Sequence, residues 1–323
     1  MIVTDKKWYN KSKELKVGYN INRLLAENLS GVPKHLQKDW DCIGIISGRN
    51  RVRIGKSSMA FQCAYFVAWL LAGGIMSVDD NSPNYGKILK KPDKKVRFDL
   101  NHVVFDPESL MKLGHELPPK SVIVYDEGRA GLESKSTMMN VNRMMEDFMQ
   151  ECGQYNHFLL IVLPDFFTLN KNFATDRSMF LIDVFTDENY RRGFFNFFAE
   201  KKKEKLYSFG RKLLGSTARY NATIPDFFGS FSKWIPFDKE DYSKLKKKAL
   251  DKKRLTKSDA RISKQRDILI YLYKSTHDFS LRELSDEIKE EFGVVIGKDV
   301  IQRACINALG IKEKKSYMDA EDS

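Results

Sequence analysis

SGRNRVRIGKSSMAFQCA, residues 47–64, begins with a basic tract and ends with an apolar one. The residues CIGIIS at 42–47 lead into it and predict a short buried strand, and residues 57–72 predict a helix that is apolar on most sides. A strand, a glycine-containing loop and a buried helix in this order form one half of a βαβ unit. The stretch therefore predicts the α/β class for the domain that contains it.

Buried strands and helices continue to alternate up to residue 185. Asp106 is in position to cap a helix that begins at Pro107, and residues 136–153 predict another helix ending at a glycine. The further predicted strands are a short one within residues 101–106, before the helix that begins at Pro107, and residues 121–128, 157–166 and 179–185. Because continuously apolar strands that alternate with helices form parallel sheets, we expect one such sheet with helices on both faces.

The composition limits the class of protein. The chain has 323 residues, of which 42% are hydrophobic, so it can bury a real core. Its four cysteines and five histidines are dispersed, which predicts reduced thiols in a cytoplasmic protein and no metal cluster. The longest apolar tract, residues 64–76, is shorter than the roughly 20 residues that a membrane-spanning helix needs, so no membrane insertion is expected.

The net charge of +12 is concentrated in two segments. Residues 191–220 carry a net +7 and residues 239–266 a net +8, so the rest of the chain is slightly acidic. The first segment is predicted to be a β-hairpin with KKKEK at its tip, and Lys201, Lys202 and Lys203 are predicted to contact DNA. The second is predicted to be a lysine-rich polar helix or linker. Both segments favour a polyanionic partner such as nucleic acid.

The last part of the chain predicts three short helices. Ser280 and Glu283 form a capping-box pair at the start of the second helix, and a glycine-containing turn precedes the third. This pattern is typical of a helix-turn-helix or winged-helix domain, in which Lys298, Gln302 and Arg303 of the third helix would face DNA. Little sequence remains for a wing, and a helical domain for protein contact is the alternative. The residues predicted to face inward are Val300, Ile301, Ala304, Cys305 and Ala308.

The residues Gly55-Lys56-Ser57 predict a cradle for nucleotide phosphates. Glycine lets the backbone approach the phosphates, lysine reaches the β- and γ-phosphates, and serine ligates Mg²⁺ at a helix N-terminus. The usual spacing would place a first glycine at position 50, where this chain has Asn50; the nearest glycine is Gly48. A chance occurrence on a charged loop is the alternative. The predicted nucleotide-binding residues are Gly48, Asn50, Arg53, Gly55, Lys56, Ser57 and Ser58, with extra positive charge from Arg49 and Arg51.

Asp126 and Glu127 follow four apolar residues at the end of a predicted strand. An aspartate there would hold Mg²⁺ together with Ser57, and the adjacent glutamate would deprotonate the attacking water. A strand that ends in ordinary solvated acids is the alternative. With the phosphate-binding motif earlier in the chain, the pair predicts ATP and Mg²⁺ as cofactors.

The motifs IGKSS and VIVYDEG resemble Walker A and Walker B of the additional-strand P-loop ATPases, which have a RecA-like sheet. Residues 40–190 are similar to the FtsK–HerA type of DNA-pumping ATPase and to related motors of archaeal or phage mobile elements. The resemblance implies that the strand with LLIVL lies between the two motif strands, with Asp165 or His157 as a sensor. It also implies a homo-oligomer, such as a ring, in which Arg177 of a neighbour completes the site; Arg129 and Arg143 are rival candidates.

The sequence therefore predicts an ATP-dependent motor that translocates or packages duplex DNA of a viral or mobile element. An ATP-switched replication initiator and a DNA-binding regulator with a degenerate P-loop are the alternatives. The predicted segments are an N-terminal extension (1–40), the ATPase core (41–190), the hairpin extension (191–238), the linker (239–261), the helix-turn-helix domain (262–312) and a tail (313–323).

Overall fold

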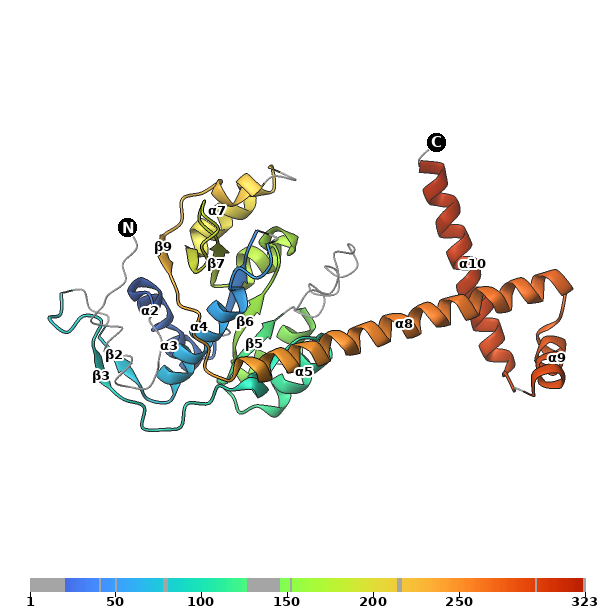
Figure 1. The fold of residues 1–323 in the computed structure, drawn as a ribbon, viewed down its shortest axis with the longest axis horizontal. Helices are drawn as coiled ribbons and strands as arrows, with labels where there is room; N and C mark the ends of the chain where they lie inside the picture. Colours follow the sequence, from blue (N-terminus) through green and yellow to red (C-terminus); the bar gives the residue numbers. More distant parts are fainter. Residues whose placement is uncertain are drawn as a thin grey trace. The chain divides into compact units, whose positions relative to one another are not determined.

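The computed structural model describes residues 21–40, 42–49, 51–77, 81–126, 146–151, 153–213, 217–293 and 295–321 (Figure 1). The chain divides into two compact units, Met1–Ala249 and Leu250–Ser323. Among the described residues, no helix is both long enough and apolar enough to cross a membrane.

A seven-stranded, mostly parallel sheet forms the centre of the first unit. Its strands lie in the order β4-β5-β6-β1-β7-β8-β9, and only β8 and β9 run antiparallel to their neighbours. The expected position of the LLIVL strand is confirmed, because β6 pairs with both β1 and β5. The strands are β1 Cys42–Ser47, β4 Val103–Val104, β5 Val122–Asp126, β6 Phe158–Val162, β7 Phe180–Phe185, β8 Phe194–Ala199 and β9 Phe227–Ser230, while β2 Ile75–Met76 and β3 Ile88–Lys90 form a separate pair.

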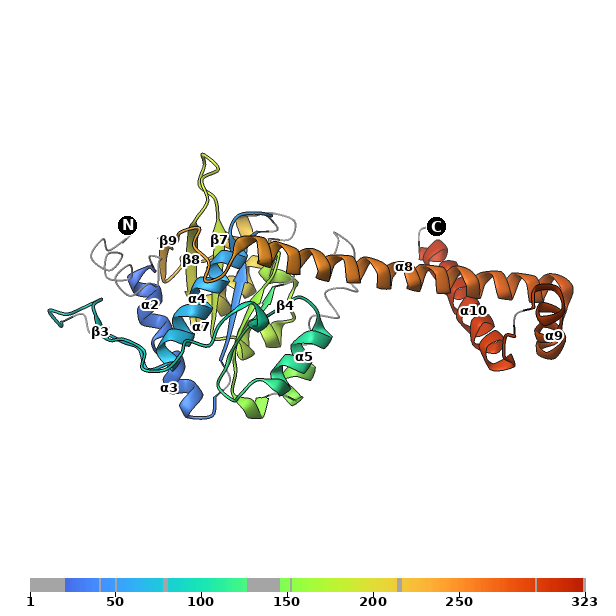
Figure 2. The same cartoon turned by 60° about the horizontal axis from the view of Figure 1, so that its bottom comes forward.

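Helices cover both faces of this sheet, as expected (Figures 1 and 2). Successive residues of a strand point to opposite faces, so Cys42 and Ile46 of β1 belong to one hydrophobic cluster and Ile43 and Ile45 to another. The first cluster includes α2 Arg23–Leu29, α3 Val32–Gln37 and α4 Lys56–Leu71; the second includes α5 Pro107–Glu116 and α7 Glu200–Gly210. The arrangement is compatible with a RecA-like fold.

Short helical segments complete the first unit, and the predicted cap at Asp106 is confirmed. Its carboxylate accepts a hydrogen bond from the backbone N–H of Ser109 at 2.9 Å. Of the helix predicted over 136–153, residues 146–151 are helical and residues 127–145 lie outside the described residues. The short segments are the 3₁₀ helices η1 Leu100–His102, η2 Gly153–Tyr155, η3 Phe166–Thr168 and η5 Thr217–Asn221, and the π-helical η4 Phe173–Arg177.

The prediction of a lysine-tipped hairpin over residues 191–212 is wrong. The lysines belong to α7, a helix that follows β8, and the hairpin partner of β8 is β7. Lys203, Leu206, Tyr207 and Gly210 are the buried residues of α7, and their spacing of three and four is the period of a helix. β8 and β9 complete the central sheet, so residues 191–238 are part of the first unit rather than an extension of it.

The lysine-rich segment is helical, which confirms the first of its two predicted forms, and the predicted tail is helical as well. A single helix, α8 Lys239–His277, runs through residues 239–261, and α10 Lys298–Glu321 continues through the region expected to fray. The first turns of α8 pack on the sheet unit through Tyr242, Leu245 and Ala249. Because residues 298–321 form one helix, the described part of the chain has no wing after α10.

The second unit contains the expected three helices around a small core. The second of these helices is α9 Leu281–Phe292, and its capping box between Ser280 and Glu283 is confirmed. Ile301, Ala304 and Ala308 are buried as predicted, whereas Val300 is 39% exposed, so its inward placement is wrong. The core cluster consists of Ile270, Leu284, Ile301 and Ala304.

Candidate functional site

The loop between β1 and α4 has the position of a phosphate-binding loop but is longer than usual. Six residues separate Gly48 from Gly55, against the usual four. A Cβ atom at Gly48 would stand 2.4 Å from Cδ1 of Ile54 and 2.9 Å from Cδ of Lys56, so a larger residue here would displace one or both of these side chains. Gly55 has a φ of 105°, which a residue with a side chain rarely adopts. Asn50 lies outside the described residues.

Lys56 begins α4 and lies across its own loop. Its ammonium donates a hydrogen bond to the backbone oxygen of Arg51 at 2.5 Å, and the N–H of Arg51 donates to the oxygen of Gly48 at 2.8 Å. Ser57 and Ser58 follow in the first turn of the helix. The backbone N–H groups of a first helical turn have no partner within the helix, so this end of α4 favours an anion.

Two loop arginines bind the carboxyl end of β7. The guanidinium of Arg49 donates from Nε and Nη2 to Oδ2 of Asp183, at 3.1 and 2.9 Å. Arg51 donates to the hydroxyl of Thr186 at 2.9 Å. The positive charge that Arg49 was expected to add beside the phosphates is paired here with a carboxylate that has no exposed surface. Arg53 is exposed.

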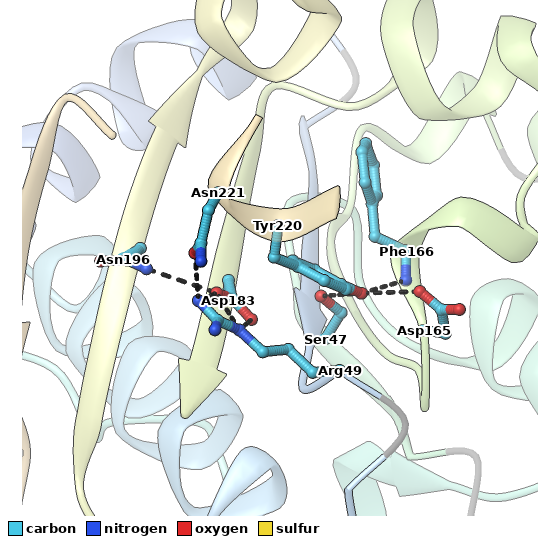
Figure 3. Close-up of polar contacts among 8 residues, drawn as sticks. All are labelled: Ser47, Arg49, Asp165, Phe166, Asp183, Asn196, Tyr220 and Asn221. Atoms are coloured by element: carbon cyan, nitrogen blue, oxygen red, sulfur yellow. Dashed lines mark hydrogen bonds and ion pairs between the residues drawn. The ribbon is translucent and has the colours of Figure 1, made fainter. Parts of the chain in front are cut away.

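Asp183 is a buried acid held by several donors. Besides Arg49, Asn196 donates to its Oδ2 at 3.3 Å. Burial raises the pKa of Asp183 from 3.8 to about 6, although the charge of Arg49 and the hydrogen bonds act in the opposite direction. Figure 3 shows the Arg49 side chain extending from the loop to this carboxylate.

Asp126 lies at the carboxyl end of β5 and is 2% exposed. Its Oδ2 accepts a hydrogen bond from the Tyr242 hydroxyl and another from the Lys246 ammonium, the latter at 2.9 Å. The Ser57 side chain hydrogen-bonds to the same Tyr242 hydroxyl. Ser57 and Asp126, predicted as the Mg²⁺ ligands, are therefore brought together around one phenol oxygen. A hydroxyl and a carboxylate are oxygen ligands of the kind that Mg²⁺ takes, so the pair fits the ion.

Asp165, the predicted sensor, belongs to a second polar cluster at the same edge of the sheet. The Tyr220 hydroxyl lies between Ser47 at the end of β1 and Asp165 beyond the end of β6, at 3.3 and 2.8 Å (Figure 3). Asp165 also forms an ion pair with Arg219, and it caps η3. Burial, followed by the nearby acids Asp165 and Asp183, raises the pKa of Tyr220 well above its ordinary value.

Two other candidates lie at the opposite edge of the sheet. His157 precedes β6 and bridges the backbone oxygen of Gly114, 2.9 Å from its Nε2, and the N–H of Ser121, 3.2 Å from its Nδ1. It therefore supports the packing of local segments rather than the phosphate loop. Arg177 is exposed at the end of η4, before the amino end of β7. Glu127 and the rival arginines Arg129 and Arg143 lie outside the described residues.

The predicted DNA-binding lysines of α7 have three different environments. Lys201 is exposed, and Lys202 donates to the backbone oxygen of Pro225 at 3.1 Å. Lys203 has no exposed surface and donates to the backbone oxygen and the hydroxyl of Ser178, so its assignment to DNA contact is wrong. Burial lowers the pKa of Lys203 to about 8.

The predicted DNA-contacting residues of the second unit lie on one accessible part of α10. Lys298, Gln302 and Arg303 are all exposed within its first two turns. Behind them, Ile301 and Ala304 enter the core, and the hydroxyl of Ser285 on α9 donates to the backbone oxygen of Ile296 at 2.8 Å. This hydrogen bond fixes the turn before α10 to α9. A helix that binds DNA with its exposed face needs such a fixed position.

The sequence reasoning did not single out Asp183, Tyr220, Tyr242 or Lys246. Asp183 had a local signal, since it is the only charged residue in the apolar strand FLIDVF. The others meet their partners across more than fifty residues, and Tyr242 and Lys246 lie 116 and 120 residues from Asp126. No local pattern encodes such contacts.

Comparison with known proteins adds no family assignment. No protein-family model matches the chain, and no curated protein is significantly similar to it.

Proposed function

We propose that the sheet unit binds ATP with Mg²⁺ and hydrolyses it, and that the chain uses this reaction to move duplex DNA of a viral or mobile element. The supporting observation is the meeting of Ser57 and Asp126 around the Tyr242 hydroxyl, although β6 separates their strands. This strand order also agrees with the resemblance to FtsK–HerA-type ATPases noted from the motifs.

Each residue of the proposed site has one task. Lys56 leaves the Arg51 oxygen and binds the β- and γ-phosphates, while the N–H groups at the start of α4 bind the phosphate oxygens. Ser57 and Asp126 hold Mg²⁺, which neutralises charge on the phosphates when it is bound. Glu127, next to Asp126 in the chain, takes the proton of the attacking water.

The proposed oligomer follows from the position of Arg177. This arginine lies at the amino edge of the sheet, whereas Ser57 and Asp126 lie at the carboxyl edge. Within one chain Arg177 and the proposed phosphate site therefore lie at opposite ends of the parallel strands. As an arginine finger it acts only on the site of a neighbouring subunit, where it stabilises charge in the transition state.

The proposed DNA contacts come from exposed side chains in both units. Lys298, Gln302 and Arg303 lie at the accessible start of α10, and Lys201 is exposed on α7. Cationic side chains gain affinity for DNA by releasing condensed counterions, without reading sequence. Gln302 and Arg303 have the donor geometry for base edges in a major groove.

Nucleotide binding tests the proposed site directly. We expect Lys56→Ala to weaken binding of a fluorescent ATP analogue about 100-fold, because a charge-assisted bond to phosphate contributes about 2–3 kcal/mol. Glu127→Gln should keep the affinity and lower kcat by about 100-fold or more. Equal turnover in Glu127→Gln would remove the assigned base, and equal affinity in Lys56→Ala would remove the phosphate site.

A separate measurement tests whether the protein moves along DNA. The ATPase rate is measured against duplex length at fixed base-pair concentration. A motor gives a rate that rises with length, because each loading event is followed by more cycles on a longer track. A rate that is independent of length would contradict translocation.

The DNA-binding regulator is the second candidate, and one observation favours it. Lys246 places an ammonium 2.9 Å from Asp126, and a cation held there permanently would exclude the metal. A regulator binds DNA equally well with and without ATP, whereas the proposed motor does not. Fluorescence anisotropy of labelled duplex in the two conditions separates them.

A further inference from the structure

Lys246 of α8 places a positive charge beside the proposed metal ligands. Its ammonium lies 2.9 Å from Oδ2 of Asp126 and 3.0 Å from the hydroxyl of Tyr242. Tyr242 in turn bonds to both Asp126 and Ser57. Two side chains of α8, one helical turn apart, thus occupy the oxygen atoms that the proposed function assigns to Mg²⁺.

Packing explains why these side chains point into the site. The ring of Tyr242 lies edge-on to Phe61 of α4, with ring centres 5.1 Å apart, and is tilted against Phe105 and Phe237 at 6.2 and 6.1 Å. Gln62 of α4 donates to the backbone oxygens of Ser232 and Trp234, both at 2.8 Å. The chain leading into α8 is therefore fixed to α4, the helix that begins with Lys56 and Ser57.

The start of α8 is fixed as well. The carboxylate of Asp238 accepts hydrogen bonds from the backbone N–H groups of Glu240 and Asp241, at 2.7 and 3.1 Å. This cap and the aromatic contacts hold Tyr242 in place. Lys246 follows four residues later on the same face of the helix, and its side chain remains 29% exposed. Lys246 can therefore leave Asp126 without disturbing the anchor.

An ammonium and Mg²⁺ cannot share this position. Asp126 is almost fully enclosed, so its carboxylate needs a cation or donors close by. In this structure Lys246 supplies that cation. Two cations within a few ångströms of each other repel strongly in a partly buried site, where water screens them weakly. Binding of one therefore requires departure of the other.

We propose that Lys246 stands in for the metal in the nucleotide-free protein and that the magnesium complex of a nucleoside triphosphate expels it. The Lys246 side chain then acts as a latch on the site, which is closed by the ion pair with Asp126 and opened by the bound complex. This inference rests on the proposed nucleotide site and adds its regulation: the site is occupied by the chain itself until Mg²⁺ and nucleotide arrive together.

A substitution series tests the latch. Affinity for a fluorescent ATP analogue is measured in excess MgCl₂ and in excess EDTA for the wild-type chain, Lys246→Met and Lys247→Met. Lys246→Met removes the competing charge, so we expect affinity with Mg²⁺ to rise about fivefold, the size of one partly screened ion pair, and affinity in EDTA to stay or fall. Lys247 is the exposed neighbour and serves as the control, with wild-type values in both conditions.

The outcomes distinguish failure of the latch from failure of the proposed nucleotide site on which it rests. If Lys246→Met and Lys247→Met bind the magnesium complex equally well while Lys56→Ala does not bind, the nucleotide site stands and the latch is wrong. If no variant and no wild-type chain binds nucleotide, the proposed function fails and the latch fails with it. A rise in affinity of the same size in EDTA would also contradict the latch, because no metal then competes.

Lysine labelling provides a measurement on the unaltered protein. Acetic anhydride is applied in short pulses, and mass spectrometry gives the ratio of label on Lys246 to label on Lys247. We expect this ratio to rise several-fold when ATP analogue and Mg²⁺ are added together, and to stay constant with EDTA. A constant ratio under saturating magnesium complex would overturn the proposal.

Discussion

The ion pair Arg49–Asp183 and the ion pair Lys246–Asp126 lie at the same edge of one sheet but differ in how firmly they are made. In both, a buried aspartate at the end of a parallel strand meets a cation from a segment more than a hundred residues away. Arg49 presents two nitrogens to Asp183, and Asn196 adds a third donor. Lys246 presents a single nitrogen to Asp126 and shares it with Tyr242.

This difference follows from the chemistry of the two cations. A guanidinium is a planar fork that binds a carboxylate in a fixed orientation, whereas an ammonium is a strongly hydrated point charge on a flexible stem. We therefore interpret Arg49–Asp183 as a permanent attachment of the loop between β1 and α4 to β7. In the Lys246–Asp126 pair, by contrast, another cation can replace the ammonium.

The largest expected effect is that of Arg49→Ala on stability. The substitution leaves Asp183 buried without its main partner, and we expect the free energy of unfolding to fall by about 3 kcal/mol. Urea unfolding followed by circular dichroism gives this value. Arg53→Ala is a matched control in the same loop, because Arg49 and Arg53 have φ values of 51° and 57°. Equal losses in both variants would show that Arg49 does not anchor the loop.

The second effect is a dependence of stability on pH that belongs to Asp183. Because burial raises its pKa from 3.8 to about 6, the native state holds this proton more tightly than the unfolded state. Stability from this group is therefore highest at low pH and falls as the pH rises through about 6.

The variant Asp183→Asn isolates this contribution. Between pH 4.5 and pH 7, the wild-type free energy of unfolding should fall by about 2 kcal/mol relative to Asp183→Asn. Urea unfolding of both chains at the two pH values measures the difference. If the two chains respond to pH in parallel, the pKa of Asp183 is not raised and the attachment to Arg49 is an ordinary ionised pair.

The smallest effect is expected from Lys246→Met in the absence of nucleotide. Lys246 is partly exposed, and Asp126 keeps the hydroxyl of Tyr242, so the loss of unfolding free energy should be about 1 kcal/mol or less. Lys247→Met should leave stability unchanged. A loss as large as that of Arg49→Ala would erase the distinction between the two pairs and make Lys246 a structural residue.

The central sheet could be predicted from the sequence because its signals are local. Buried parallel strands are short apolar runs, and the helix cap at Asp106 depends on neighbouring residues. The place of the LLIVL strand between the two motif strands came with the family resemblance. The α7 helix was missed because lysines between aromatic runs also fit a hairpin tip. Only the spacing of Lys203, Leu206 and Tyr207 separates the two interpretations, and it places a lysine inside.

The candidate site was predictable only in part, for a physical reason. Ser57 and Asp126 are named by motifs that give both residue type and strand context. Tyr242 and Lys246 lie in a polar, lysine-rich segment where every residue fits a solvated helix. Their role depends on aromatic packing against Phe61 and Phe105, which only the folded chain brings together.

The outermost strands of the central sheet also bear on how copies of the chain can associate. The edge strands are short: β4 has two residues and β9 has four. Each edge strand therefore offers few unpaired backbone N–H and C=O groups with which a strand of another chain could pair. Pairing of edge strands from two copies of the chain into one continuous sheet is therefore disfavoured. The homo-oligomer proposed above would therefore be joined by side chains on helices and loops rather than by a β-ladder shared between subunits.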